Sequence, residues 1–329
     1  MSMIQEKIQI NQVTMPGRLF MPPVGSYKAE DDGTVTEALV EHYGARAANP
    51  NVAMITTEHT FFMREGMKCL RMLGLDSDDK IPGLKRITDA IHAQGKIAIC
   101  QLNHCGAAAD PAAIGLPAAK APSAILLPEP VRQGRTVVPT AMTREDIRQV
   151  EEEMVKAAVR AKKAGYDGVE IHCAHAYLLN QFYSPLTNLR TDEYGGSLEN
   201  RARALLETID LVRAAVGKDY LISVRLGGCD YTEGGSTIED AVQTAKWIQD
   251  HSADMISVTG GMCGYIRKGH LEPGYFSDMS KAIKDAVSIP VLLAGGVKTL
   301  DDAEALLESG VCDMIGAARK LFADPAWEA

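Results

Sequence analysis

The amino-acid sequence predicts an α/β fold, namely a single (β/α)8 TIM barrel with a long excursion after strand 3. Short apolar runs rich in β-branched residues recur eight times along the chain, and helical patterns separate them. Strands that alternate regularly with helices pair in parallel through right-handed crossovers. Eight strands in 329 residues favour a closed barrel over an open doubly wound sheet. No linker or internal repeat divides the chain, so we expect one domain over residues 1–329.

The individual helices and strands follow from local patterns. The clearest helix begins after Thr143, with Asp146 three residues later as in a capping box, and its apolar positions recur with helical spacing up to Gly165. A second helix begins after Thr237, with Asp240 in the same relation. The expected strands are the eight apolar runs, at residues 19–21, 52–57, 97–102, 169–172, 221–226, 255–259, 291–294 and 314–316.

The excursion after the third strand covers residues 107–141. This segment is rich in Pro, Ala and Gly and has no helical period. Loops of that length in compact domains are usually functional or contain small hairpins. We therefore expect an excursion that lies over the functional site.

Composition and charge exclude several classes of protein. The formal net charge of −9 and the pI near 5.4 argue against nucleic acid or an anionic membrane as the main partner. No apolar run is long enough to cross a bilayer, and the N-terminus lacks the layout of a signal peptide, so we expect a cytoplasmic protein. Seven cysteines without a C-x-x-C pair argue against a disulfide framework and a cysteine-only iron–sulfur site.

Residues 168–177 contain the strongest candidate for a catalytic site. A buried strand leads into His172 and His175, and Tyr177 follows two residues later. Two neutral hydrogen-bond donors and one weak acid can bind a carbonyl oxygen and deliver a proton next to it. The polar, glycine-containing segment 188–200 comes shortly after them. Ordering such a segment costs conformational entropy, so we expect it to have a role.

The active sites of TIM barrels lie at the carboxyl ends of the strands, and most functional-looking side chains of this sequence fall there. After the seventh and eighth strands, Gly295, Gly296 and Arg319 match the place where barrels bind phosphate, because free backbone N–H groups attract an anion and an arginine adds a bidentate contact. Neither a Rossmann fingerprint nor a P-loop is present. Flavin mononucleotide (FMN) therefore fits these positions better than a Rossmann-bound dinucleotide.

Motifs along the whole chain carry a family resemblance. The most specific is H-x-x-H-x-Y at 172–177, followed by SPLTNLRTDEYGGSLENR at 184–201. The others are CQLNHCG at 100–106, APSAI at 121–125, RLGGCDYTEGG at 225–235 and AARKLFADPAW at 317–327. Together they resemble the Old Yellow Enzyme family of NADH:flavin oxidoreductases, and most of all the barrel domain of the branch with 2-enoate, 2,4-dienoyl-CoA and bile-acid-inducible reductases.

The resemblance implies an ene-reductase with non-covalent FMN that is re-reduced by NADH or NADPH. His172 and His175 would bind the oxygen of an α,β-unsaturated carbonyl compound. Tyr177 would protonate Cα after hydride passes from flavin N5 to Cβ. The positions expected to bind the cofactor are Pro23, Val24, Gly25, Glu58, Gln101, His172, Arg225, Gly295, Gly296, Ala318 and Arg319.

The sequence also departs from the family pattern. Gly25 stands where many bacterial relatives have threonine or cysteine near the ring, and Ala318 stands where glycine is usual. Larger relatives continue into a four-cysteine cluster and nucleotide-binding domains, whereas this sequence stops at Ala329. We expect no iron–sulfur cluster within it. It is either a barrel cropped at its C-terminus or one that takes electrons directly from a nicotinamide cofactor.

Other interpretations of the same residues remain open. A metal at His172 and His175 would need further ligands that the spacing does not supply, so we expect no metal site. Arg64, Lys68 and Arg71 form a basic group in the loop after the second strand. Two interpretations are open, contact with an anionic substrate group and a solvated face, and the solvated face is favoured. A phosphate-binding barrel lyase or isomerase that acts on a phosphorylated substrate without flavin is the alternative function, and a barrel that only binds its ligand is a third. The substrate could be an enone, an enoate or an enoyl thioester, and the chain could form a homo-oligomer.

Overall fold

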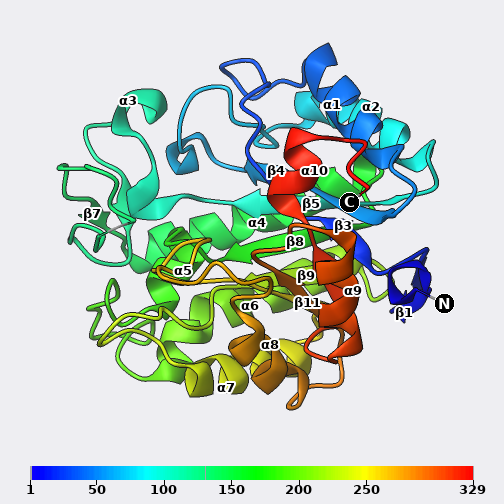
Figure 1. Ribbon diagram of the computed structural model, residues 1–329. Coiled ribbons are helices and arrows are strands. Elements are labelled where there is room, and N and C mark those ends of the chain that lie inside the picture. Colours follow the sequence, from blue (N-terminus) through cyan, green and yellow to red (C-terminus); the bar gives the residue numbers. More distant parts are fainter. Residues whose placement is uncertain (1, 130, 329) are drawn as a thin grey trace.

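The computed structural model describes residues 2–129 and 131–328, and its centre is a closed barrel of eight parallel strands (Figure 1). Each of the eight predicted strands is a barrel strand, and the one predicted at 52–57 continues to Phe61. The strands are β3 (Leu19–Met21), β4 (Val52–Phe61), β5 (Ile97–Asn103), β8 (Gly168–Cys173), β9 (Leu221–Leu226), β10 (Met255–Val258), β11 (Val291–Ala294) and β12 (Met314–Gly316). The predicted TIM barrel is therefore confirmed.

Helices cover the outside of the barrel and join successive strands. Both predicted capping boxes are present: Thr143 and Asp146 begin α4 (Arg144–Lys163), and Thr237 and Asp240 begin α7 (Ile238–Asp250). The other outer helices are α1 (Glu37–Ala47), α2 (Ile81–His92), α6 (Leu198–Val216), α8 (Ser277–Lys284) and α9 (Leu300–Glu308). Shorter helical segments are α3 (Pro111–Ile114), α5 (Leu178–Tyr183), α10 (Ala318–Ala323) and the 3-10 turns at Met3–Gln5, Arg64–Gly66, Asp78–Lys80 and Gly106–Ala108.

An antiparallel hairpin of β1 (Ile8–Ile10) and β2 (Val13–Met15) covers the amino end of the barrel. Its Ile10 and Met15 are buried in the cluster of apolar side chains that fills that end. The barrel members of the cluster include Phe20, Met54, Ile99, Leu221, Met255, Leu292 and Met314. In Figure 1, β1 and the excursion with α3 and β7 lie at opposite ends of the molecule. The amino end is thus packed with apolar side chains.

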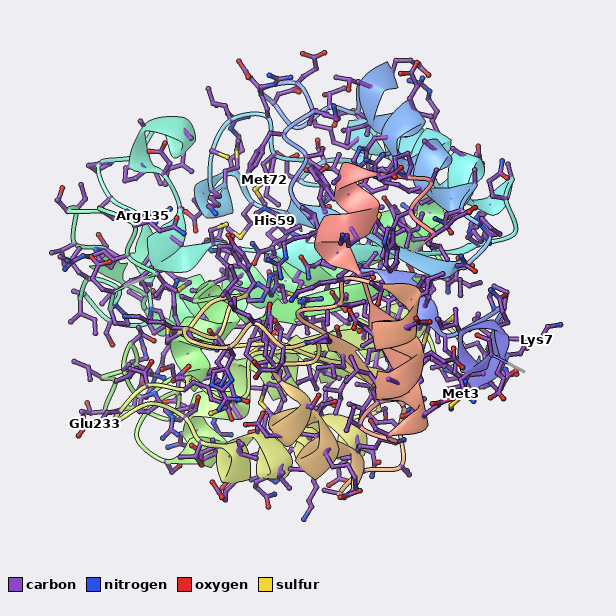
Figure 2. The ribbon with its side chains drawn as sticks, viewed as in Figure 1. Met3, Lys7, His59, Met72, Arg135 and Glu233 are labelled. Atoms are coloured by element: carbon purple, nitrogen blue, oxygen red, sulfur yellow. The ribbon has the colours of Figure 1, made fainter. Side chains whose placement is uncertain are left out.

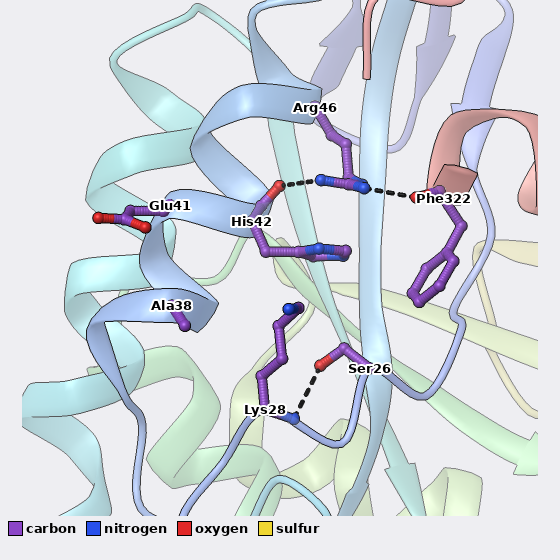
Figure 3. A pocket seen from close by; sticks show the side chains of 7 residues that line it. All are labelled: Ser26, Lys28, Ala38, Glu41, His42, Arg46 and Phe322. Carbon is purple, nitrogen blue, oxygen red and sulfur yellow. Dashed lines mark hydrogen bonds between the residues drawn. The ribbon is translucent and has the colours of Figure 1, made fainter. Parts of the chain in front are cut away.

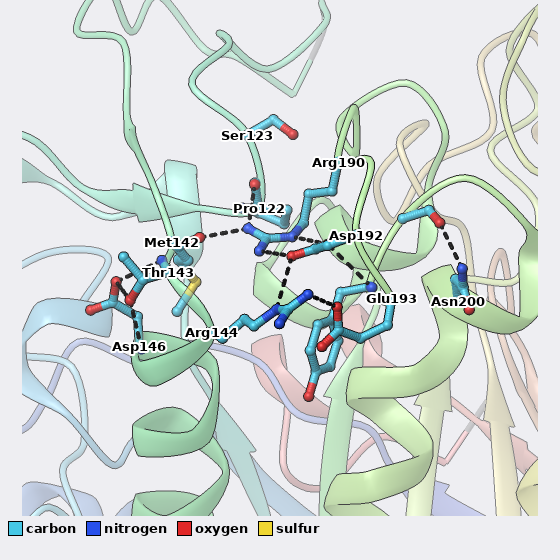
Figure 4. Close-up of polar contacts among 12 residues, drawn as sticks. Pro122, Ser123, Met142, Thr143, Arg144, Asp146, Arg190, Asp192, Glu193 and Asn200 are labelled. Carbon is cyan, nitrogen blue, oxygen red and sulfur yellow. Dashed lines mark hydrogen bonds and ion pairs between the residues drawn. The ribbon is translucent and has the colours of Figure 1, made fainter.

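The two stems of the excursion after β5 are held together where they leave the barrel. Its strands β6 (Lys120–Ala121) and β7 (Thr140–Ala141) form a small two-stranded sheet. Arg190 donates to the carbonyl oxygen of Pro122 at 3.1 Å and to that of Met142 at 2.5 Å, and it forms an ion pair with Asp192 (Figure 4). One side chain from the 188–200 segment therefore holds both stems of the excursion.

The 188–200 segment is ordered by close packing as well as by polar contacts. Gly195 lies against Arg190, and a Cβ at this glycine would be 2.2 Å from the carbonyl oxygen of Arg190. Asn188 donates to the carbonyl oxygens of Phe182 and Tyr194. The sequence predicted that this polar segment has a role. In the structure the role is a structural one, because Arg190 of the segment holds the stems of the excursion.

Candidate active site

A cavity of about 400 Å³ opens at the carboxyl end of the barrel. It brings together every predicted site residue except Glu58. The lining residues are Pro23, Val24, Gly25, Tyr27, His59, Lys68, Gln101, His172, His175, Tyr177, Arg225, Thr259, Tyr265, Tyr275, Ala294, Gly295, Gly296, Val297, Gly316, Ala318 and Arg319. Side chains from distant parts of the sequence therefore meet at one rim, as the barrel fold requires.

His172, His175 and Tyr177 form a compact group of rings. The ring of His172 meets the rings of His175 and Tyr177 edge-on, with centroids 5.1 Å apart in both pairs. His175 and Ala176 both have a φ of 59°, a left-handed conformation that costs a non-glycine residue on the order of 1 kcal/mol. The side-chain oxygen of Asn180 accepts a hydrogen bond from the N–H of Ala176 at 2.9 Å, which holds this turn.

The protonation states of these rings suit the binding of an oxygen. Burial lowers the pKa of His172 and of His175 well below the usual value, with Arg225 adding to the effect, so both imidazoles are neutral at pH 7. Burial raises the pKa of Tyr177 well above its usual value, so its hydroxyl keeps its proton. Neutral imidazole N–H groups and a protonated phenol are hydrogen-bond donors.

A polar network lies deeper in the barrel, at the ends of β5, β8 and β9. Arg225 is buried and pairs in register with His172 of the neighbouring strand. Glu170 accepts hydrogen bonds from Gln101 at 2.8 Å and from Ser223 at 3.0 Å. Among the described residues, neither Nε of Arg225 nor Nδ1 of His172 has a hydrogen-bond partner, although both atoms are buried. Both residues line the cavity, so their side chains lie where a ligand in it would be bound.

The opposite wall of the cavity is suited to an anion. Gly296 has a φ of 76°, and a Cβ there would lie 2.3 Å from the carbonyl oxygen of Glu272, so only glycine fits. Ala318 and Arg319 come from the start of α10 and line the cavity beside Gly295 and Gly296. An exposed backbone and a guanidinium group are the usual partners of a phosphate.

Glu58 is placed differently from the prediction. It lies behind the loop that contains Gly25, where its carboxylate accepts hydrogen bonds from the N–H and the hydroxyl of Ser26 and from the hydroxyl of Tyr43. Burial raises the pKa of Glu58 to about 7. Its contacts are with the loop beneath the cavity, so it positions cavity residues and does not line the cavity itself.

A β-bulge explains both the position of Glu58 and a residue that the sequence analysis missed. In the β4–β5 ladder, Thr57 pairs with Cys100 and Thr60 pairs with Leu102, so Glu58 and His59 together face one residue of β5. Such a bulge changes the direction of side chains. Glu58 points under the loop and His59 lines the cavity. The apolar run predicted the strand but not the extra residue in it.

Other cavity residues were missed because they lie on loops. Tyr27, Lys68, Tyr265 and Tyr275 line the cavity, and Lys68 was interpreted as part of a solvated basic group. Thr259, at the end of β10, lies 2.9 Å from Nε2 of His175. The loop conformations that bring the first four residues inward leave no periodic signal in the sequence.

The excursion lies beside Tyr177. Its Ala108, Ala109 and Leu127 pack with Tyr177 and Met262 in one apolar cluster. Among the described residues, none of those that line the cavity comes from residues 107–141. Figure 2 shows Arg135 of the excursion on the same side of the molecule as His59 and opposite Met3 and Lys7. The described part of the excursion therefore packs against Tyr177 from the side and does not cover the cavity.

A second cavity, of about 600 Å³, lies outside the barrel between α1 and α10 (Figure 3). Ser26, Lys28, His42, Arg46 and Phe322 are among its lining residues. Burial, with Arg46 and Lys28 nearby, lowers the pKa of His42 to about 4. None of the predicted catalytic or cofactor-binding residues lines this second cavity. The cavity at the carboxyl end of the barrel is therefore the candidate active site.

Two further features of the described residues bear on the class of protein. Within residues 2–129 and 131–328, no three His, Cys, Asp or Glu side chains gather in a way that could hold a metal ion. In the same ranges, no helix has both the length and the apolar character that a membrane crossing requires.

A TIM barrel whose mouth has ring donors on one side and a wall of Gly295, Gly296 and Arg319 on the other is compatible with the class of flavin-dependent oxidoreductases. Comparison with known proteins agrees with this class. The sequence profile of the NADH:flavin oxidoreductase / NADH oxidase family matches residues 4–329, and the chain belongs to that family.

Relatives and solved structures support the same assignment. The chain is 34% identical over 325 residues to the NADH oxidase of Thermoanaerobacter brockii, covering 97% of this chain but 49% of that protein. It is 35% identical over 319 residues to the NADPH dehydrogenase of Halalkalibacterium halodurans, covering 97% of this chain and 90% of that protein. It thus spans about half the length of the first relative and most of the second.

Two solved structures share the whole barrel. A 2-naphthoyl-CoA reductase in complex with 2-naphthoyl-CoA has a TM-score of 0.92 at 28% identity, over 98% of this chain and 51% of that one. The Old Yellow Enzyme homologue from Zymomonas mobilis has a TM-score of 0.84 at 29% identity, over 98% of this chain and 90% of that one. The resemblance to the Old Yellow Enzyme family is therefore confirmed.

Proposed function

We propose that the chain is an FMN-dependent ene-reductase that uses NADH or NADPH to reduce the C=C bond of an α,β-unsaturated carbonyl compound. The observation that carries this proposal is the arrangement of the cavity. Neutral donors and a protonated phenol lie at one end, and a glycine–arginine wall lies at the other. Family membership supports the use of a flavin and a nicotinamide cofactor.

The residues present fit FMN. Arg225 brings a positively charged hydrogen-bond donor to the cavity, and Gly296, where a Cβ would meet the carbonyl oxygen of Glu272, brings bare backbone to the cavity wall. Gly295, Gly296, Ala318 and Arg319 would hold the phosphate. Gln101 and Arg225 would contact the polar edge of the ring system, and Pro23, Val24 and Gly25 would lie beside it. Bound FMN would supply hydride transfer, taking it from the nicotinamide and giving it to the alkene.

The protein groups perform the rest of the chemistry. The neutral imidazoles of His172 and His175 would donate hydrogen bonds to the substrate carbonyl oxygen and so stabilise negative charge that develops on it. The hydroxyl of Tyr177 would protonate Cα. Because the pKa of this phenol is raised by burial, it keeps its proton until a strong base, such as a carbanion-like carbon, is next to it.

Known proteins support the choice of electron donor and acceptor. The relatives named above are an NADH oxidase and an NADPH dehydrogenase, and a morphinone reductase bound to tetrahydroNAD has the same fold, with a TM-score of 0.84 at 26% identity. The 2-naphthoyl-CoA complex has a thioester in its site. For this chain we retain enone, enoate and enoyl thioester as the range of substrates.

The alternative of a flavin-free lyase or isomerase has less support. That chemistry needs a carboxylate or a lysine next to the reacting carbon. Glu58, the carboxylate predicted at the rim, lies behind the Gly25–Ser26 loop, so this alternative would have to use Lys68, which lines the cavity. Among the described residues that line the cavity, none is an aspartate or a glutamate.

The test is an absorption spectrum of the purified protein, repeated on the supernatant after heat denaturation. We expect the bands of oxidised flavin, released by heat and identified as FMN. A colourless protein that also fails to take up added FMN would contradict the proposal and favour the phosphorylated-substrate alternative.

A further inference from the structure

Two further polar side chains of the cavity, His59 and Lys68, lie around Tyr177. The bulge in β4 turns His59 into the cavity, where its ring stacks on that of Tyr177 with centroids 5.5 Å apart and an interplanar angle of 15°. The Nζ atom of Lys68 lies 5.8 Å from the centroid of the same phenol ring. Both residues line the cavity.

His59 is held so that it can act as a neutral donor. The side-chain amide of Asn103 donates to its Nδ1 at 3.1 Å, which places the ring proton on Nε2. Burial, with Lys68 nearby, lowers the pKa of His59 to about 3, so the ring is uncharged at pH 7. Its Nε2 lies 3.3 Å from the position of a Cβ at Gly25. The glycine at position 25 therefore leaves room for this imidazole.

Lys68 differs from the other basic residues of its loop. Arg64 is exposed and Arg71 contacts the carbonyl oxygen of Ala29, whereas Lys68 lines the cavity. Among the described residues, Lys68 makes no salt bridge, and the cavity wall contains no carboxylate that could neutralise it. A partly buried cation next to a neutral N–H donor is a site for an anionic oxygen.

We propose that the substrate carries a carboxylate in addition to its activating carbonyl group, and that Lys68 and Nε2 of His59 bind this carboxylate. The inference rests on the proposed function and narrows its substrate class to small anionic enones and related oxo acids. The carbonyl oxygen occupies the His172–His175 pair, and the carboxylate lies at the other side of the site, so the substrate is held at two points around Tyr177.

The proposal predicts a preference for anionic ligands that binding measures without turnover. The probes are 4-hydroxybenzoate and its neutral counterpart 4-hydroxybenzamide, whose phenol groups occupy the carbonyl subsite. Their dissociation constants are obtained from the long-wavelength absorption that they produce with the FMN-loaded protein. A charge-assisted contact corresponds to roughly a ten- to hundredfold difference in affinity. We expect at least a tenfold preference for the benzoate, decreasing with added salt.

Matched variants locate the source of this preference. In Lys68→Gln the two probes should bind with about equal affinity. In Lys68→Arg the preference for 4-hydroxybenzoate should remain, because the positive charge is kept. His59→Phe keeps the stacked ring but removes the N–H, and it should weaken the preference severalfold. Arg64→Gln removes the same charge from the same loop outside the cavity and should change nothing. Circular dichroism shows whether each variant is folded.

Three outcomes would overturn the proposal. They are equal affinity of the wild-type protein for both probes, a preference that survives Lys68→Gln, and a preference that is lost equally in Arg64→Gln. Measurement of kcat/KM for 2-cyclohexenone, for 3-oxocyclohex-1-ene-1-carboxylate and for an enoyl-CoA extends the test to substrates. Selectivity for the thioester without selectivity for the small carboxylate would assign the anion to CoA phosphates and also contradict the proposal.

Failure of this inference is distinguishable from failure of the proposed function. Reduction of the neutral 2-cyclohexenone by the wild-type protein tests the ene-reductase activity independently of any anion site. If that reaction occurs and the anion preference is absent, only the carboxylate subsite is wrong.

Discussion

The carboxylate of Glu58 accepts hydrogen bonds from both the N–H and the hydroxyl of Ser26, at 3.1 and 2.5 Å. Ser26 directly follows Gly25, which lines the cavity. A titratable group is thus connected to the cavity wall through one residue, and its protonation state affects the loop on which the flavin ring would rest.

Glu58→Gln should change how stability depends on pH. The folded-state pKa is raised to about 7 from an ordinary value of 4.5, so the folded protein keeps this proton after the unfolded chain has lost it. The wild-type protein therefore loses stability as pH rises from 4.5 to 7, by up to about 3 kcal/mol. Chemical denaturation at pH 5 and pH 8 should show the variant gaining relative stability at the higher pH. A constant difference at both values would contradict the assigned pKa.

Tyr177→Phe should separate the two half-reactions. Reduction of the flavin by NADH or NADPH should be unchanged, because the hydroxyl has no role in it. Anaerobic reoxidation by 2-cyclohexenone should slow by about 100-fold, the usual contribution of a positioned acid. Stopped-flow absorbance measures both rates, and unchanged reoxidation would exclude Tyr177 as the proton donor.

His172→Ala should weaken the binding of phenolic ligands. Removing one of two donors to the bound oxygen should raise the dissociation constant by roughly tenfold and reduce the long-wavelength absorption band. His251→Ala, on the exposed end of α7, is the matched control and should bind as the wild type does. The carbonyl-binding role would be wrong if the band persisted in His172→Ala at unaltered affinity.

Gly296→Ala should abolish the binding of FMN. The added Cβ would lie 2.3 Å from the carbonyl oxygen of Glu272, so the loop must move away from the phosphate position. Gly310→Ala is the control, since its φ of 68° is similar but its Cβ would meet nothing within 4 Å. Arg319→Gln should raise the dissociation constant for FMN by about 10- to 100-fold. Titration followed by flavin fluorescence gives the dissociation constant for FMN of all three variants. Wild-type affinity for FMN in Gly296→Ala would show that the phosphate binds elsewhere.

Arg190→Lys should release the excursion while the barrel stays folded. Lysine cannot make the parallel contacts through which the arginine reaches Pro122, Met142 and Asp192. Trypsin cleavage after Arg132 and Arg135 should therefore become about tenfold faster. Arg148→Gln serves as the control, because Arg148 is an exposed residue of α4 that forms an ion pair with Glu145 and lies outside the excursion. Equal cleavage rates in both variants would show that Arg190 does not hold the excursion.

The sequence was sufficient to predict the barrel and most of the cavity. Strands buried in a parallel barrel are continuous apolar runs, so their positions are visible directly, and their carboxyl ends must converge. This is why His172, Arg225 and Gly296, which are far apart in the chain, could be assigned to one site. Their roles toward FMN and the substrate remain predictions.

The residues that were missed depend on geometry that has no sequence period. Glu58 leaves the cavity lining and His59 enters it because of one extra residue in β4, which lies beyond the apolar run predicted at 52–57. For Lys68 the sequence left two interpretations open, contact with an anionic substrate group and a solvated face, and the solvated face was favoured because basic residues in a loop usually face water. Only the path of the loop shows that one of them turns inward.

The contact of Arg190 with both stems of the excursion has a consequence for how this protein can vary in sequence. The pairing of β6 with β7 and the guanidinium group of Arg190 fix the two ends of the excursion. The residues between these ends can therefore change in number while the ends stay in place. Lengthening such a closed loop costs little free energy, since the entropy of closure grows only with the logarithm of its length. Insertion or deletion in this stretch, which packs beside Tyr177 through Leu127, would therefore leave the eight-stranded frame and the wall of Gly295, Gly296 and Arg319 unchanged.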